Sequence, residues 1–258
     1  MSDALRLAFG TLTTWRVPPP RVIDSRVAGR AMLLAPLVML PLLAVIALAL
    51  WAVAVLIGYS APPALLAALL VTVHVFSTRA MHLDGIADVA DGLSASYDRA
   101  RALEIMKRSD VGPSGVGAIV LALAVQITAL AYLADEGALV AAGVALLASR
   151  QTLAWGCHRS VPAATPSGLG ATVARSVSTP TLTVSTIALF AVAAGASWLS
   201  GLPVTVGVAA VVGAVAANLA LLARCRSRLG GITGDVLGAG IELGFSASLA
   251  AAALVLAV

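Results

Sequence analysis

The sequence predicts an all-α fold, a polytopic transmembrane helical bundle of about seven transmembrane helices that forms one integral membrane domain over residues 1–258. Two observations support this fold class. Hydrophobic residues make up 60% of the chain and charged residues 11%, whereas an ordinary soluble domain has about 25% charged residues. The apolar residues also gather in runs that approach the roughly 20 residues needed to cross a bilayer. We therefore expect a lipid bilayer around most of the chain.

Seven apolar segments are expected to cross the bilayer: 31–57, 64–80, 115–133, 138–155, 182–199, 204–223 and 236–258. The second and fourth segments are short and the last contains Glu242, so the count can differ by one. Residues 1–30 precede the first segment, are basic and contain three consecutive prolines, so we expect a cytoplasmic segment and no cleavable leader. Neither the two cysteines nor the three scattered histidines indicate a disulfide framework or a zinc site.

The basic residues indicate which connections face the cytoplasm. With seven crossings, the connections at 58–63, 134–137 and 200–203 contain no lysine or arginine. All 16 basic residues fall on the other side: five before residue 31, five within 79–108, three within 150–175 and three within 224–228. The positive-inside rule places that side in the cytoplasm. This asymmetry accounts for the basic net charge without a nucleic-acid partner.

The first candidate functional segment, 79–114, contains Asp84, Asp88 and Asp91 at helical spacing. Because each residue of a helix advances by roughly 100°, steps of four and seven put the three carboxylates within an arc of about 60° on one face. Such anions repel one another, and a cation would neutralise them. Oxygen ligands favour Mg²⁺ or Mn²⁺ over zinc. The alternative is a helix end whose acids face water, although ionisable residues at membrane depth usually have a function.

Three more side chains of this segment are candidates. His82 precedes Asp84 by two residues, so a regular helix turns its ring roughly 160° away, and it could act as a base only if the chain is irregular there. Residues 98–110 are predicted to form a helix at the membrane surface. Its Lys107 and Arg108 bind either substrate phosphates or lipid headgroups, and the sequence leaves both readings open.

The second candidate segment, 224–240, joins Arg224, Arg226 and Arg228 to Gly230-Gly231-Ile232-Thr233-Gly234-Asp235. Its glycines permit backbone shapes in which several N–H groups point at one anion, so a phosphate could bind there. Asp235 would add a fourth carboxylate to the metal site, and Glu242 would lie near the same helix face. The alternative is a glycine-rich turn beside positive-inside arginines. Both segments and Gly168-Leu169-Gly170 are expected on the cytoplasmic side, where one composite site can form.

These segments resemble the adenosylcobinamide-GDP ribazoletransferase family, also called cobalamin synthase or cobalamin-5′-phosphate synthase. The resemblance spans nearly the whole chain and is most specific in four blocks in the same order. They are His82-Leu83-Asp84-Gly85-x-Ala87-Asp88-x-x-Asp91-Gly92, Arg101 to Lys107, Gly168-Leu169-Gly170, and Gly230-Gly231-x-Thr233-Gly234-Asp235-x-Leu237-Gly238-Ala239 with Glu242-Leu243. The resemblance implies a multi-pass enzyme of the bacterial inner membrane whose active site faces the cytoplasm.

The resemblance further implies a Mg²⁺-dependent phosphotransferase of coenzyme B12 biosynthesis. The adenosylcobinamide phosphate moiety of adenosylcobinamide-GDP is transferred to α-ribazole or its 5′-phosphate, and GMP leaves. The catalytic residues would be Asp84, Asp88, Asp91 and His82, with Asp84, Asp88, Asp91 and Asp235 binding Mg²⁺ and Lys107, Arg108, Thr233, Arg224, Arg228 and Glu242 contacting substrate. The attacking ribose hydroxyl would lose its proton to His82, to a carboxylate or to metal-bound water. Assembly into a homo-oligomer is compatible with the resemblance.

Two positions depart from the family pattern. Many members have Lys-Asp-Ser-Arg where this chain has Lys107-Arg108-Ser109-Asp110, which exchanges the charges, and Phe245 stands where a second glutamate is common. The family pattern therefore does not support a role of Arg108 or Asp110 in substrate contact, and either a second glutamate is not required or Glu242 suffices.

Two other functions fit parts of the pattern. A membrane CDP-alcohol phosphotransferase also uses helix-borne aspartates and Mg²⁺, but its Asp-x-x-Asp-Gly-x-x-Ala-Arg motif has arginine where Asp88 stands. A cation or metabolite transporter would also carry acids inside the membrane, although such proteins often show inverted repeats, and we find no repeat.

Overall fold

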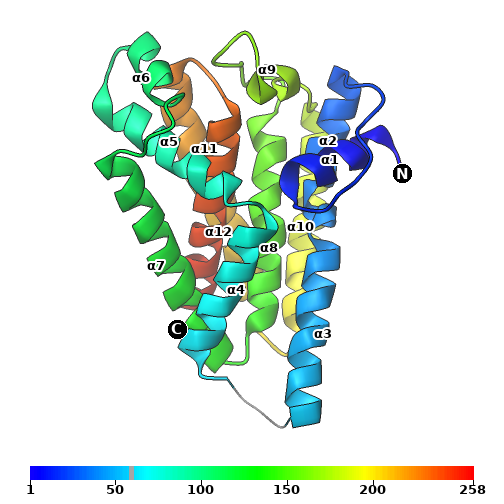
Figure 1. Cartoon of the computed structure of the whole chain (residues 1–258). Helices are drawn as coiled ribbons and strands as arrows, with labels where there is room; N and C mark the ends of the chain where they lie inside the picture. The colour runs from blue at the N-terminus through cyan, green and yellow to red at the C-terminus, as the bar shows by residue number, and fades with distance from the viewer. Residues whose placement is uncertain (58–60) are drawn as a thin grey trace.

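The computed structural model describes residues 1–57 and 61–258 and confirms the all-α polytopic bundle (Figure 1). The helices of this part of the chain are α1 (Asp3–Leu12), α2 (Ser25–Val38), α3 (Leu40–Ile57), α4 (Pro63–Ser77), α5 (Met81–Ala95), α6 (Arg99–Ile105), α7 (Pro113–Asp135), α8 (Leu139–Gly156), α9 (Leu169–Val173), α10 (Thr179–Leu199), α11 (Val204–Leu229) and α12 (Gly234–Leu256). The described residues form no strand and contain two isolated β-bridges, His158–Val177 and Ala163–Ile232.

Within the described ranges, five helical stretches are long and apolar enough to cross a membrane: Ser25–Val53, Pro113–Asp135, Thr179–Leu199, Val204–Leu229 and Gly234–Leu256. A sixth crossing results if α4 and α5, which meet at a bend of 87°, form one broken span. The predicted segment 138–155 forms α8, in which buried Arg150 and Gln151 interrupt the apolar run. The exact count of seven therefore stays a prediction.

Helix α12 occupies the centre of the bundle. It packs against α11, α5, α8 and α7, and small residues let its neighbours approach closely. A Cβ at Gly213 of α11, for example, would lie 2.6 Å from the carbonyl oxygen of Ala247. Such small-residue contacts are the usual way in which membrane helices pack, because the helices gain dispersion contacts that lipid cannot match.

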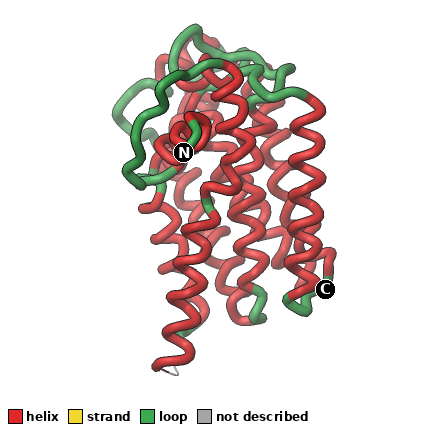
Figure 2. The backbone as a smooth tube through the Cα atoms, turned by 90° about the vertical axis from the view of Figure 1, so that its right-hand side faces the viewer, coloured by secondary structure: helices red, strands yellow, loops and turns green. Residues whose placement is uncertain are grey.

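The short helices gather at one end of the bundle, opposite to the C-terminus (Figures 1 and 2). The first of them, α1, lies in the basic stretch 1–30, for which the sequence indicated no helix. Ser2 caps α1, and its apolar side, made of Ala4, Leu7, Ala8 and Leu12, is buried. Since α1 packs against α2, the N-terminal segment forms part of the wall at this end.

The bend between α4 and α5 is built from two residues in the left-handed region, Arg79 (φ 58°) and Ala80 (φ 55°). Neither is a glycine, so each position costs of order 1–2 kcal/mol. Local contacts hold the turn: the Ala80 N–H donates to the Val75 carbonyl at 2.9 Å, and the Thr14 N–H donates to the Ser77 carbonyl at 2.9 Å. The bend sends α5 across the end of the bundle, where its carboxylates meet α12.

Candidate functional site

The candidate site is centred on the junction of α5 and α12. A Cβ at Gly85 would lie 2.7 Å from the Asp235 carbonyl oxygen and 3.2 Å from the Ala239 nitrogen, so only glycine allows this approach. Asp84 immediately precedes Gly85, and Asp88 follows one turn later on the same helix. The close packing of the two backbones therefore brings acids from distant parts of the sequence to one place.

The carboxylates of this junction repel one another. The charges of Asp84, Asp235 and Asp91 all act on Asp88 and repel a negative charge there. Among the described residues, no lysine, arginine or histidine forms an ion pair with any of these acids. An uncompensated group of carboxylates attracts a cation, and oxygen donors are the ligands that Mg²⁺ prefers.

The side chains do not converge as they stand. In the described part of the chain, no three acidic, histidine or cysteine side chains are gathered closely enough to hold a metal ion. Asp84 is exposed, whereas Asp88 and Asp235 are half-buried. The chemistry of the donors thus fits Mg²⁺, while a closed coordination shell would require these side chains to turn toward a common point.

Asp91 is engaged differently from the rest of the predicted triplet. Its carboxylate accepts hydrogen bonds from the backbone N–H groups of Gly112, at 2.6 Å, and Gly115, at 2.8 Å. These groups stand at the start of α7, where free N–H donors and the helix dipole favour an anion. Asp91 is buried, so in this arrangement it ties α5 to α7. In the sequence, Gly112-Pro113 is typical of a helix start and therefore indicated where these free N–H groups would lie.

Asp235 is positioned by the first turn of α12. The Thr233 hydroxyl accepts a hydrogen bond from the Val236 N–H at 3.2 Å, as an N-cap does, and donates to the Asp235 carboxylate at 3.1 Å. Thr233 therefore orients the carboxylate and leaves the N-terminus of a 23-residue helix beside it.

The loop between α8 and α10 is pinned to the turn before α12. The Ile232 N–H donates to the Pro162 carbonyl at 2.9 Å, and the Ala164 N–H donates to the Ile232 carbonyl at 2.8 Å. A Cβ at Gly170 would lie 2.7 Å from the Ile232 carbonyl oxygen. The structure thus brings the Gly168-Leu169-Gly170 block to the N-terminus of α12, in the same place as the two candidate segments.

Two cavities flank Asp235. The first, which we call the polar cavity, has a volume of about 290 Å³ and contains Lys107, Thr165, Ser167 and Thr233 in its lining. The second, the apolar slot, has a volume of about 130 Å³. Its lining includes Met32, His82, Asp84, Leu153, Leu237 and Ile241. Leu169, Gly234 and Asp235 line both cavities, so they form the wall that the two share.

The predicted basic residues divide into two groups. Lys107 lines the polar cavity, whereas Arg108 and Arg224 are exposed and line neither cavity. Arg228 donates hydrogen bonds to the carbonyls of Ser96, at 2.5 Å, and Leu93, at 3.3 Å. Its guanidinium also lies 3.9 Å from the centre of a tyrosine ring. Arg228 therefore holds the C-terminal end of α5.

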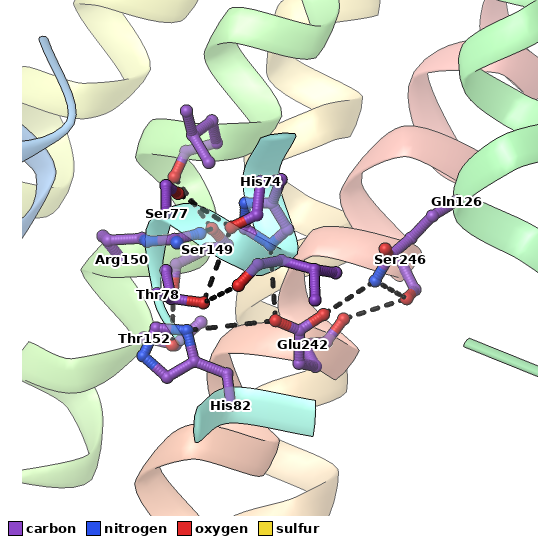
Figure 3. Close-up of polar contacts among 12 residues, drawn as sticks. His74, Ser77, Thr78, His82, Gln126, Ser149, Arg150, Thr152, Glu242 and Ser246 are labelled. Atoms are coloured by element: carbon purple, nitrogen blue, oxygen red, sulfur yellow. Dashed lines mark hydrogen bonds and ion pairs between the residues drawn. The ribbon is translucent and has the colours of Figure 1, made fainter. Parts of the chain in front are cut away.

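Glu242 lies in a buried polar network inside the bundle (Figure 3). Gln126 donates to its carboxylate at 2.9 Å, and the Nε2 atom of His74 lies 3.3 Å from Oε1. Arg150, which is fully buried, donates to the Ser149 hydroxyl close by. Glu242 lines neither of the two cavities that flank Asp235. Its predicted contact with substrate stays a prediction, and its observed contacts are structural.

His82 joins this network from the other side. It belongs to the regular helix α5, and its Nδ1 atom lies 3.9 Å from Glu242 Oε1 (Figure 3). His82 is 2% exposed, whereas Asp84 is exposed. His82 therefore faces Glu242 inside the bundle, and it also lines the apolar slot together with Asp84. His74, Gln126 and Arg150 were not predicted as site residues, although polar residues inside apolar segments were a usable signal.

Comparisons with known proteins agree across the chain. The family model described as "Cobalamin-5-phosphate synthase" matches residues 4–253. The chain is 43% identical to the adenosylcobinamide-GDP ribazoletransferase of Nocardioides sp. (strain ATCC BAA-499 / JS614) over 251 residues, which are 97% of this chain and 98% of that protein. It is 39% identical to the protein of the same name from Frankia casuarinae over 256 residues, 95% and 92% of the two chains. The Pseudomonas aeruginosa (strain UCBPP-PA14) protein is 37% identical over 98% of this chain and 100% of its own. No solved structure matches.

Proposed function

The chain belongs to the cobalamin-5-phosphate synthase family, and from this premise we propose how its residues carry out the family's transfer reaction. The activity is that of an adenosylcobinamide-GDP ribazoletransferase, which acts late in cobalamin biosynthesis. The observation that carries the assignment of the site is the position of Asp235, which stands in the wall between two cavities and beside the carboxylates of α5.

The reaction exchanges one phosphorus–oxygen bond for another. A ribose hydroxyl of α-ribazole, or of its 5′-phosphate, attacks the phosphorus that carries adenosylcobinamide. A new bond forms between that oxygen and the phosphorus, the bond to the GMP phosphate oxygen breaks, and GMP leaves with the electron pair. The hydroxyl proton passes to a base near the reacting oxygen. Protein groups must therefore hold a diphosphate and a nucleoside side by side.

The polar cavity suits the diphosphate of the donor. Lys107 supplies a positive charge at one side of it, and the Thr233–Gly234 start of α12 supplies backbone N–H groups at the other. The N-terminus of a long helix attracts phosphate because its first N–H groups are free and the helix dipole is positive there. Ser167 and Thr165 add hydroxyl groups to the same lining.

We assign the Mg²⁺ site to Asp84, Asp88 and Asp235, whose uncompensated carboxylates lie at one helix junction. When bound there, the ion would neutralise negative charge on the diphosphate and on the departing GMP. The protein's own part is to hold the acids in place through the Gly85 contact and the Thr233 hydroxyl. Asp91 supports this arrangement through its two hydrogen bonds to the start of α7.

We also propose that the site faces the cytoplasm from a bacterial inner membrane. The candidate site lies at the end of the bundle that carries α1, α6 and α9 (Figure 1). The basic residues of the sequence are concentrated in the segments of that end, as the positive-inside rule requires of the cytoplasmic side.

A complementation experiment tests the proposed function. A bacterial strain that lacks its cobalamin synthase is supplied with cobinamide and with this chain, and growth that requires cobalamin is measured. We expect growth with the natural chain and none with Asp235→Asn at equal abundance in the membrane. Absence of growth with the natural chain, in a strain that a known family member restores, would contradict the proposal and direct attention to CDP-alcohol substrates.

A further inference from the structure

The apolar slot differs from the polar cavity in a way that suggests a different ligand. Its walls are mostly aliphatic side chains, among them Met32, Leu153, Leu237 and Ile241. Among the described residues, no lysine or arginine lines it. A phosphate group would therefore be poorly held there, whereas a flat apolar ring would gain from burial.

The size of the slot also limits its occupant. Its volume is about 130 Å³, close to the roughly 150 Å³ of an apolar cavity that binds benzene. A corrin macrocycle is far too large for such a space, but the aromatic base of a nucleoside can enter it. The remainder of that nucleoside would then reach the shared wall at Gly234 and Asp235.

One polar side chain of this slot has Glu242 Oε1 at 3.9 Å from its Nδ1 atom, beyond hydrogen-bond distance, and has no hydrogen-bond partner among the described residues. His82 lines the slot and is 2% exposed, yet neither of its ring nitrogens makes a hydrogen bond within the described residues. Buried polar groups are nearly always hydrogen-bonded, and an unsatisfied one calls for a missing ligand or water. A ligand that is apolar except for a few polar atoms would satisfy this ring.

On these grounds, and resting on the proposed function, we propose that the apolar slot is the binding site for the aromatic base of the acceptor nucleoside. The base packs against Leu153, Leu237 and Ile241, and His82 hydrogen-bonds a polar group of the nucleoside. The ribose then lies beside Asp84 and Asp235, next to the diphosphate in the polar cavity. The slot selects the acceptor, and the polar cavity holds the donor.

Gly238 offers a way to narrow the slot without disturbing the fold. It lines the slot, and a Cβ added there would lie 3.4 Å from the His82 Cα and 3.6 Å from the Met81 carbonyl oxygen, which are ordinary contact distances. Gly238→Ala therefore reduces the space at one wall. Ile241→Val removes a methyl-sized group from another part of the lining, so it should restore the space that the alanine at position 238 occupies. Gly195→Ala is the matched control, because its Cβ meets no atom within 4 Å.

The test is a steady-state comparison of two acceptors with the purified chain. They are α-ribazole, whose base carries two methyl groups, and the corresponding nucleoside of unsubstituted benzimidazole. We expect Gly238→Ala to raise KM for α-ribazole by roughly 10-fold or more, as one methyl group in a filled pocket does. KM for the smaller acceptor should rise less, and KM for adenosylcobinamide-GDP should stay unchanged. In the double variant Gly238→Ala with Ile241→Val, KM for α-ribazole should return toward that of the natural chain.

Three results would overturn the inference: equal changes for both acceptors, a rise in KM for the GDP substrate alone, or no change in any constant. A failure of the proposed function looks different, because the natural chain would then release no GMP with either acceptor. If Gly238→Ala proves unstable, Ile241→Val alone still decides the matter. It should improve acceptance of bases larger than that of α-ribazole, and an unchanged preference would contradict the slot assignment.

Discussion

The backbone of Gly85 in α5 touches that of Asp235 in α12, so that a Cβ at Gly85 would stand 2.7 Å from the Asp235 carbonyl oxygen. This contact fixes the distance between the acids on the two helices. It also explains why a glycine stands between Asp84 and Asp88, on a helix where alanine would otherwise be more favourable by about 1 kcal/mol.

Gly85→Ala should therefore separate α5 from α12 and misplace the carboxylates. A displacement of about 1 Å at a reacting centre can reduce the rate by roughly 100-fold, and we expect a loss of that order in GMP release. Gly117→Ala on α7 is the control, since its Cβ would lie in open space. Normal activity of Gly85→Ala would show that the observed helix contact is not needed for transfer.

Neutralising any of the acids at the junction should stop the reaction while leaving the fold intact. Asp84→Asn, Asp88→Asn and Asp235→Asn keep the shape of the side chain and remove the charge that would hold Mg²⁺. We expect GMP release to fall by about 100-fold or more, with thermal unfolding unchanged. Asp98→Asn is the control, because Asp98 caps α6 and asparagine caps helices equally well. A variant that keeps full activity removes its residue from the proposed site.

Asp91 should behave differently from Asp84 in a stability measurement. Asp91→Ala leaves the N–H groups of Gly112 and Gly115 without their acceptor. An unsatisfied buried donor costs about 1–3 kcal/mol, so the melting temperature in detergent should fall. Asp84→Ala removes an exposed side chain and should not lower it. Equal melting temperatures for the two variants would contradict the anchoring role of Asp91.

Glu242→Leu should destabilise the bundle rather than weaken substrate binding. The change removes the acceptor of Gln126 and the partner of His74, and breaking a buried polar network of this kind costs about 3–5 kcal/mol. We expect a lower yield of folded protein and an earlier unfolding transition, with KM for both substrates unchanged in the folded fraction. A raised KM at normal stability would instead support the substrate contact that the sequence suggested.

The sequence predicted the helical bundle and the meeting of the candidate segments because both follow from local patterns. Apolar runs of bilayer length predict crossings, and loop charge assigns the blocks to one side. The spacing of Asp84, Asp88 and Asp91 likewise predicted a shared helix face. In the structure Asp84 and Asp88 lie on α5 near Asp235, whereas Asp91 binds the start of α7.

Other features depend on tertiary contacts that no local pattern reports. The left-handed turn at Arg79 and Ala80 joins two residue types that rarely adopt it, so the bend between α4 and α5 was not predicted. The partners of Asp91 lie more than 20 residues along the chain. The contacts of the Glu242 carboxylate come from α4, α5 and α7, and only the folded bundle brings these helices to α12.

The most direct test of the account is a single incubation of the purified, detergent-solubilised chain with adenosylcobinamide-GDP, α-ribazole and Mg²⁺, with and without EDTA. GMP and cobalamin are followed by mass. We predict that both products form together, that EDTA abolishes them, and that excess Mg²⁺ restores them. Formation of neither product, while a known family member works alongside, would contradict the proposed function, and formation of both in the presence of EDTA would contradict the Mg²⁺ site at Asp84, Asp88 and Asp235.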